Sequence, residues 1–281
     1  MISLSSFLRF CFSNIFLFTL ASYEHYHTNE LLNNSLLYQI CAMCSMGLFR
    51  NYFLFNTIKN LTKNHISINN NEKISPKEDY PNQFTFDFIR ITLIESIGTF
   101  FIPYILTIKN TYQENHFYSY FYEWFLFLFA SFYIEIMFDL FHYLNHRLLH
   151  EIPFLYKNFH KYHHQHHHPN LMTTYHHNSF DFIFTNTLPL YISIYLYTKL
   201  FPLTLFQLKM IVIMKVAVEL FGHCGKDIYK TGSFFQCMWF PKIFGFELYV
   251  KDHDLHHSKN NCNYAKRFAL WDMVLNTYHK D

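Results

Sequence analysis

The chain has 281 residues, of which 51% are hydrophobic, 21% are aromatic and only 15% are charged. Soluble domains usually have about 25% charged residues, so this composition favours a membrane protein over a soluble all-α protein with a very apolar core. The formal net charge of +2 comes without a dense basic patch, which argues against a nucleic-acid partner. The six cysteines, including the Cys41–Cys44 pair in an apolar run, predict no disulfide scaffold.

Apolar segments that could cross a membrane occur along most of the chain, since one helical span needs about 20 mostly apolar residues. They are Leu4–Ala21, Leu36–Phe55, Phe88–Ile108, Tyr118–Asp139 and the hairpin pair Phe182–Tyr197 and Leu203–Leu220. Arg50, Glu95, Glu123 and Glu135 interrupt them, which favours a packed bundle over isolated anchors. Leu4–Ala21 precedes no small-residue cleavage site, so we interpret it as a retained helix rather than a secretory signal. We expect an all-α integral-membrane bundle of about four to six segments.

Loop charges give this bundle an orientation. The loop Thr57–Asp87 contains Lys59, Lys63, Lys73 and Lys77, whereas Ser22–Ser35 contains no Lys or Arg. Cationic loops lie on the cytoplasmic side of a membrane. Because Tyr118–Asp139 ends on the same side as the lysine-rich loop, we expect the histidine-rich segment that follows to face the cytoplasm. In a eukaryotic cell the expected membrane is that of the endoplasmic reticulum.

Twenty histidines are the most informative feature of the chain, and nine of them lie within residues 139–168. His142, His146 and His150 recur every four residues, and Asp139 lies three residues before His142. On a helix these four side chains share one face. The helix is expected to end near Ile152, because Pro153 disfavours helical geometry in the residue before it.

Two further clusters share the spacing HxxHH. They are His160, His163 and His164, and His253, His256 and His257. With His146 and His150 they make eight histidines, whereas a structural zinc takes four ligands and often includes cysteine. The pattern therefore predicts two metal ions, but imidazole suits iron, zinc, copper and nickel alike, so the spacing does not name the ion.

A third pattern lies at the end of the last apolar segment, where Lys215, Glu219 and His223 recur every four residues. Ionisable residues in such a segment face the bundle interior and are usually functional. We predict His223 as a further ligand. Glu219 is predicted either to bind metal or to orient an imidazole, and its alternative is an ion pair with Lys215.

Other polar residues near the boxes are weaker candidates. His142 and Asp139 are expected beside the ligands rather than among them. His176 and His177 share a turn with Asp181, and one of the two is a candidate outer ligand. We predict solvated positions for the three histidines at 166–168. No catalytic side chain is predicted beyond the metal ligands.

At these residues the sequence resembles the fatty acid hydroxylase/sterol desaturase superfamily of membrane-bound non-haem di-iron oxidases. The family's HRxxH, HKxHH and HDxHH boxes match residues 146–150, 160–164 and 253–257. Its HxG element and its NYG…LWD ending are similar to residues 223–225 and 263–272. The resemblance extends over residues 135–277, with departures at Ala265 and Asn276, where the family commonly has glycine, and at residues 176–181, which lack the family's proline.

The resemblance implies a di-iron centre that uses O₂ to oxidise an unactivated C–H bond of a lipid, by hydroxylation or desaturation. It also implies external electrons, from NAD(P)H through a reductase and a small haem protein, since the chain has no CxxCH or GxGxxG motif. We expect N-terminal membrane helices and a cytoplasmic loop in residues 1–117, and a catalytic domain in residues 118–281.

Three alternatives remain open at this point. Within the oxidases, the spacing of the HRxxH box favours a sterol or a related lipid, and a fatty-acyl or ether lipid is the other substrate class. A histidine-rich metal transporter is an alternative of another kind, although the histidines lie at the expected helix ends rather than along a path through the membrane. A degenerate relative that serves as a scaffold is disfavoured, because all eight box histidines are intact.

Overall fold

A computed structural model describes residues 4–31, 33–69, 81–106, 108, 117–228 and 239–280 of the chain. Two positions that the sequence analysis used, Lys73 and Lys77, lie outside these residues. Within the described residues the fold is all-α, as predicted, with two isolated β-bridges that join Ser67 to Lys226 and Glu247 to Phe268.

Four long helices correspond to the four predicted single spans, although α3 ends at Ile105, before the predicted end at Ile108. They are α1 (Leu4–Leu31), α2 (Leu36–Thr62), α3 (Pro81–Ile105) and α4 (Phe117–Glu151). Two stretches, Gln83–Ile105 in α3 and Ser119–Glu151 in α4, are long and apolar enough to cross a membrane. The end of α4 at Glu151 confirms the stop predicted before Pro153.

The predicted hairpin is also helical. Its first arm consists of α6 (Ser179–Phe182), a π-helical turn at Ile183–Thr187 and α7 (Leu188–Leu200). Its second arm is α8 (Leu205–Gly222), which begins with a capping box between Thr204 and Gln207.

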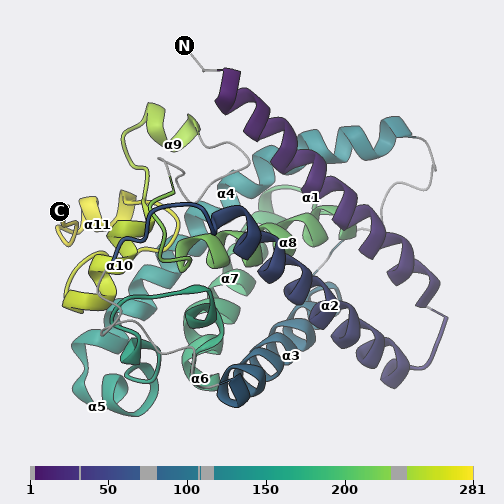
Figure 1. The fold of residues 1–281 in the computed structure, drawn as a ribbon. Coiled ribbons are helices and arrows are strands. Elements are labelled where there is room, and N and C mark those ends of the chain that lie inside the picture. Colours follow the sequence, from purple (N-terminus) through teal and green to yellow (C-terminus); the bar gives the residue numbers. More distant parts are fainter. Residues whose placement is uncertain are drawn as a thin grey trace.

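Helix α8 lies at the centre of the bundle, and all its residues from Phe206 to Leu220 are buried. It packs against α1, α2 and α4, while α3 packs on α2 and α7 packs on α4. Figure 1 shows α1, in purple, lying across α8. A helix that is buried on every side forms the core of its domain, so α8 is the element around which the other long helices are arranged.

Short elements form a cap at one end of this bundle (Figure 1). After α4 the chain passes through α5 (Pro153–Leu155), a π-helical turn at Tyr156–His160 and two 3₁₀ turns, His163–Gln165 and Leu171–Tyr175. The C-terminal part adds α9 (Trp239–Ile243), α10 (Val250–Lys259) and α11 (Leu270–Val274). These elements contain two of the three histidine boxes, and the HRxxH box lies at the end of α4.

Three of the four charged residues that interrupt the apolar segments, Arg50, Glu95 and Glu135, form ion pairs, and the Glu123 carboxylate accepts a hydrogen bond from the Thr204 hydroxyl. Lys215 Nζ lies 3.0 Å from Glu95 Oε1, and Arg50 Nη2 lies 3.3 Å from Glu95 Oε2. Arg267 Nε lies 3.0 Å from Glu135 Oε2. A buried charge is stable only when it is paired, so these contacts explain why charged residues interrupt the apolar segments and confirm the expectation of a packed bundle.

We predict that Glu95→Ala strongly destabilises the protein, because it leaves both Arg50 and Lys215 without this carboxylate. Breaking a buried ion pair from one side costs about 3–5 kcal/mol. The measurement is the melting temperature of the detergent-solubilised protein, with the exposed Glu30→Ala on α1 as the control. Equal melting temperatures for the two variants would contradict the pairing.

Candidate metal centre

The structure brings nine histidines together in two adjoining groups. One group consists of His146, His150, His160, His164 and His256, and the other of His163, His223, His253 and His257. Within each group the candidate ligand nitrogens lie within 4.8 Å of one another. Eight of the nine residues are buried, and His150 is partly buried. They are the same nine residues that the sequence analysis predicts as metal ligands.

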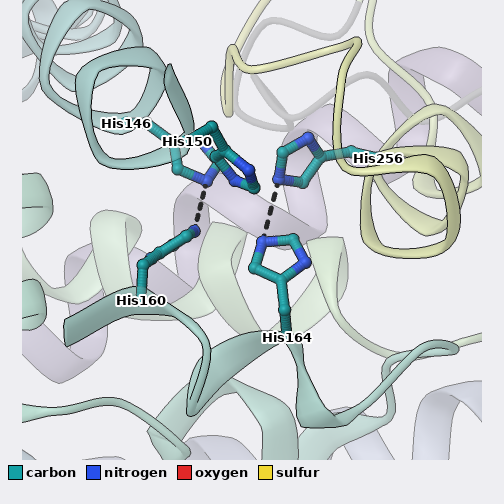
Figure 2. A group of neighbouring side chains, drawn as sticks. All are labelled: His146, His150, His160, His164 and His256. Atoms are coloured by element: carbon teal, nitrogen blue, oxygen red, sulfur yellow. Dashed lines mark hydrogen bonds between the residues drawn. The ribbon is translucent and has the colours of Figure 1, made fainter. Parts of the chain in front are cut away.

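Four chain segments supply these side chains. His146 and His150 project from one face of α4, and His160, His163 and His164 come from the turns that reverse the chain after Pro153. The end of α8 supplies His223, and α10 supplies the other three. Figure 2 shows the five rings of the first group converging from α4, the turns and α10.

Both HxxHH boxes are divided between the two groups. His160 and His164 belong to the first group, whereas His163 between them belongs to the second. In α10, His256 belongs to the first group and its neighbour His257 to the second. Each box therefore connects the two groups, and the spacing HxxHH is what allows one short segment to reach both.

Backbone carbonyls fix the orientation of five rings. The Nδ1 atom lies 2.7–3.2 Å from a carbonyl oxygen in His146 (Tyr264), His163 (His176), His223 (Glu219), His256 (Cys262) and His257 (His166). A carbonyl only accepts hydrogen bonds, so Nδ1 donates in each ring and Nε2 keeps its lone pair. This arrangement is typical of metal-binding imidazoles, whose other nitrogen is held by a carbonyl or a carboxylate.

A close contact between two rings of the first group tests whether this donor set fits a metal ion. His146 Nε2 lies 3.0 Å from His160 Nε2, and the Nδ1 atoms of the two rings face the Tyr264 carbonyl and the Asp181 carboxylate. With each proton on Nδ1, toward its nearby acceptor, the two Nε2 lone pairs point at each other. A bound cation would remove this repulsion, because both lone pairs would then be donated to the ion. The residues present therefore fit a metal.

Burial favours the neutral form of several rings in the two groups. Burial lowers the pKa of His163, His164 and His257 far below the usual value, and it lowers the pKa of His256 to about 3. Removing an imidazolium from water is costly, and the neighbouring rings add to the effect. Metal binding needs the neutral ring, so these ligand nitrogens are ready without loss of a proton.

Asp181 connects two of the histidines. Its Oδ1 lies 3.0 Å from His160 Nδ1, and its Oδ2 lies 3.0 Å from His177 Nδ1. The His177 ring stacks on His163 with 3.9 Å between centroids, and His177 Nε2 is buried without a hydrogen-bond partner. His177 thus lies beside the second group and stays a candidate ligand. Asp181 was not predicted as a site residue, although its i, i+4 spacing from His177 was a signal for it.

The three other candidates do not belong to either histidine group. The Glu219 carboxylate lies 2.9 Å from Lys215 Nζ and 3.3 Å from Arg267 Nη2, so it forms the ion pair given as its alternative. Asp139 accepts hydrogen bonds from the backbone N–H groups of residues 266–268. His142 Nδ1 contacts the Thr185 carbonyl at 2.6 Å. Glu219 and Asp139 thus attach the cap to the bundle, whereas His142 joins α4 to the π-helical turn Ile183–Thr187.

Gly225 allows a close approach between two parts of the cap. It has φ of +64°, and a Cβ atom added there would lie 2.5 Å from the Pro169 carbonyl oxygen. Pro169 ends the segment whose His166 carbonyl accepts a hydrogen bond from His257. A side chain at Gly225 would therefore disturb the second histidine group as well as the local backbone.

We predict that Gly225→Ala lowers both the melting temperature and the amount of bound metal. The matched control is Gly245→Ala, because Gly245 also has a positive φ, of +71°, but has no heavy atom within 4 Å of an added Cβ. The control should cost about 1 kcal/mol of stability and keep the metal. Equal metal loss in both variants would show that backbone strain alone, rather than the contact with Pro169, is responsible.

An apolar cavity of about 490 Å³ adjoins the second group. Its wall contains residues of α1, α2 and α8, and His223 and His253 also line it. Small-molecule sites commonly have volumes of about 300–1,000 Å³ and are mostly apolar with a few polar groups. The sequence analysis did not predict that α1 and α2 take part, because no pattern in residues 4–62 points to the histidines.

Comparison with known proteins agrees with these observations. The fatty acid hydroxylase family matches residues 131–277, which is more than half of the chain and contains all nine histidines. This chain belongs to the fatty acid hydroxylase family. It is 40% identical over 62 residues to the fatty acid hydroxylase vlmA of Lecanicillium sp.. That match covers 21% of this chain and only 17% of the relative. No solved structure matches.

Family membership makes the chain an oxidoreductase candidate with a membrane location, which the two long apolar helices support. The family match begins within α4, so α1, α2 and α3 lie outside it. The expected boundary between an N-terminal part and a catalytic domain, at residues 117 and 118, stays a prediction. The cavity is lined by α1 and α2, which lie outside the family match, and by α8, which lies within it.

Proposed function

We propose that this protein is an O₂-dependent lipid oxidase, a hydroxylase or a desaturase, in which the two histidine groups hold two iron ions. The single observation that supports it most is the position of nine buried imidazoles next to an apolar cavity. Imidazole also binds zinc, so zinc is the alternative ion. Membership of the fatty acid hydroxylase family favours iron.

The proposed reaction needs O₂ and two external electrons. Bound iron would supply the activation of O₂ and the removal of hydrogen from a C–H bond. In hydroxylation, one C–H group, O₂, two electrons and two protons give an alcohol and one water. In desaturation a second hydrogen leaves the lipid, and two waters form. We propose that the electrons come from NAD(P)H through a reductase and a small haem protein, which act as partners of this chain.

The protein side chains have a supporting role in this proposal. The five carbonyl contacts keep the Nδ1 protons in place, so that the Nε2 lone pairs remain available. Asp181 holds His160 and His177 in fixed orientations. The apolar cavity binds the lipid and excludes water from the second group. Fixed orientation of ligands by surrounding groups commonly changes metal affinity or activity by 10–100-fold.

Two substrate classes are compatible with these features. The spacing of the HRxxH box at His146–His150 favours a sterol or a related lipid. The relative named as a fatty acid hydroxylase favours a fatty-acyl lipid. An ether lipid belongs to the same class as the fatty-acyl lipid. All three present an unactivated C–H bond on a largely apolar molecule, which suits the cavity.

A histidine-rich metal transporter is the alternative from another class. Transporters place ionisable residues along a path through the membrane. Here the nine histidines gather in the cap and at the ends of α4 and α8, and most of the charged residues that interrupt the apolar segments form ion pairs. This arrangement supports the oxidase over the transporter.

We predict that purified protein contains about two iron ions per chain and that loss of a histidine from either group removes iron. His256→Ala tests the first group and His163→Ala tests the second, and both should abolish lipid-dependent O₂ consumption. Iron is measured by elemental analysis. The control is His27→Ala, because His27 lies on the exposed surface of α1.

Either of two results would overturn this proposal. One is full turnover in both cap variants, which would exclude direct ligation by these residues. The other is iron-free protein that moves zinc across vesicles, which would support the transporter.

We also propose that the cap faces the cytoplasm, with the endoplasmic reticulum as the membrane in a eukaryotic cell. The first turns of α1 and the last turns of α2 line the same cavity as His223 and His253. The connection between α1 and α2 must therefore lie at the opposite end of the bundle. Lys59 and Lys63, at the end of α2, then lie at the histidine end of the bundle, and the positive-inside rule supports a cytoplasmic position for that end.

This topology predicts that the sequon Asn33-Asn34-Ser35, between α1 and α2, is accessible to the glycosylation machinery of the endoplasmic reticulum. Expression in a eukaryotic cell should give a glycan that a glycosidase removes, whereas a sequon inserted after Lys63 should stay unmodified. A glycan on the inserted sequon alone would invert the orientation.

A further inference from the structure

The two ends of the apolar cavity differ in exposure and in chemistry. At one end Leu8 is 57% exposed, Phe12 is 60% exposed and Leu61 is 51% exposed. At the other end His223 and His253 are buried. The cavity therefore has a mouth between the start of α1 and the end of α2, and an inner end at the second histidine group. The exposed apolar side chains place the mouth where lipid can enter.

Arg9 is the distinctive residue of the mouth. It is exposed, it lines the cavity, and it is the only Lys or Arg before Arg50 in the sequence. The other charged residues in the lining are Glu219 and Lys266, which are both buried and 3.9 Å apart. Arg9 is thus the charged group of this lining that meets a molecule as it enters. A guanidinium is well suited to a carboxylate or a phosphate.

The wall between the two ends is apolar. It includes Leu54, Ile58, Ala217 and Val218, which are all buried. Burying a charged group against such a wall without a partner is costly. A lipid with an ionic head group is therefore stable in one orientation, with its head at the mouth and its hydrocarbon chain inside.

Gly222 limits the inner end. It is the last residue of α8 and lines the cavity beside His223. A Cβ atom added at Gly222 would have no heavy atom within 4 Å. A side chain at this position would therefore extend into open space rather than into the protein, which makes it a position where the cavity can be shortened without a steric clash.

We propose that this cavity binds a lipid with an anionic head group, that Arg9 binds the head group at the mouth, and that the hydrocarbon chain reaches His223 and His253. The inference rests on the proposed oxidase function and narrows it. It selects acyl lipids with a carboxylate or phosphate head over a neutral sterol. It also places the oxidised carbon in the hydrocarbon chain, at a distance from the head group.

The orientation is tested by photolabelling of the full-length protein in nanodiscs of neutral phosphatidylcholine. Two long-chain fatty acids are used, one with a diazirine beside the carboxyl group and one with a diazirine near the methyl end. Peptide mapping should place the first label near Leu8 and Phe12, and the second near Gly222 and Val250. The reverse pattern, or labelling outside the cavity only, would overturn the orientation.

The role of Arg9 is tested in the same assay with matched variants. Arg9→Gln should reduce labelling by the carboxylate probe about fivefold, which corresponds to a modest charge-assisted contact at an exposed site. Lys59→Gln removes an exposed charge from α2 outside the cavity and should have no effect. A methyl-ester probe should label both variants and the wild type equally. Equal labelling of Arg9→Gln and wild type by the carboxylate probe would exclude this role.

Gly222→Leu supplies the second readout. It should suppress labelling by the methyl-end probe while the melting temperature stays unchanged, and undiminished labelling would contradict the placement of the chain at the inner end. Labelling requires neither iron nor turnover. A protein that binds the probes as described but oxidises no lipid would refute the proposed function alone, whereas oxidation of a neutral sterol without dependence on Arg9 would refute this inference alone.

Discussion

The centre depends on the burial of neutral imidazoles whose lone pairs point at one another. His146 Nε2 and His160 Nε2 lie 3.0 Å apart, and the Nδ1 atom of each ring faces an acceptor. Such a contact is repulsive in isolation, and a buried acceptor without a partner costs about 1–3 kcal/mol. A cation bound between these two rings would reverse the sign of this interaction. Metal binding would then be part of the folding energy of the cap.

One residue of α8 joins this centre to the membrane bundle. The Glu219 side chain pairs with Lys215 and Arg267, while its backbone carbonyl accepts the hydrogen bond from His223. The pairing continues from Lys215 to Glu95 of α3. The position of His223 is therefore linked to the packing of helices that lie outside the family match. This linkage gives the N-terminal helices a structural reason to be present, in addition to their part in the cavity wall.

The sequence was sufficient for the parts of the site that depend on local spacing. His146 and His150 share a helix face because they are four residues apart, and Pro153 ends that helix at the predicted place. All nine predicted ligands lie in the two groups, and their binding of iron is a proposal. The division of each HxxHH box between two groups was not predictable, since it depends on how three separate segments meet.

Other features left no pattern that could be recognised in one sequence. Carbonyl acceptors such as that of Tyr264 belong to the backbone, so any residue type can supply them. Glu95 and Lys215 are 120 residues apart, and nothing local pairs them. Spacing placed Glu219 on the same helix face as Lys215 and His223. Whether it serves the metal site or forms an ion pair could be decided only once the structure placed Arg267 beside it. The residues of α1 that line the cavity are apolar, as in any membrane helix. Only the fold shows that they form part of the cavity wall.

The central claim is that these imidazoles hold two iron ions, and X-ray absorption at the iron edge tests it most directly. Protein loaded with iron should give nitrogen scattering with the outer-shell pattern of several imidazoles per ion, because the two groups contain five and four histidines. A spectrum dominated by sulfur, or by oxygen without imidazole scattering, would contradict the account.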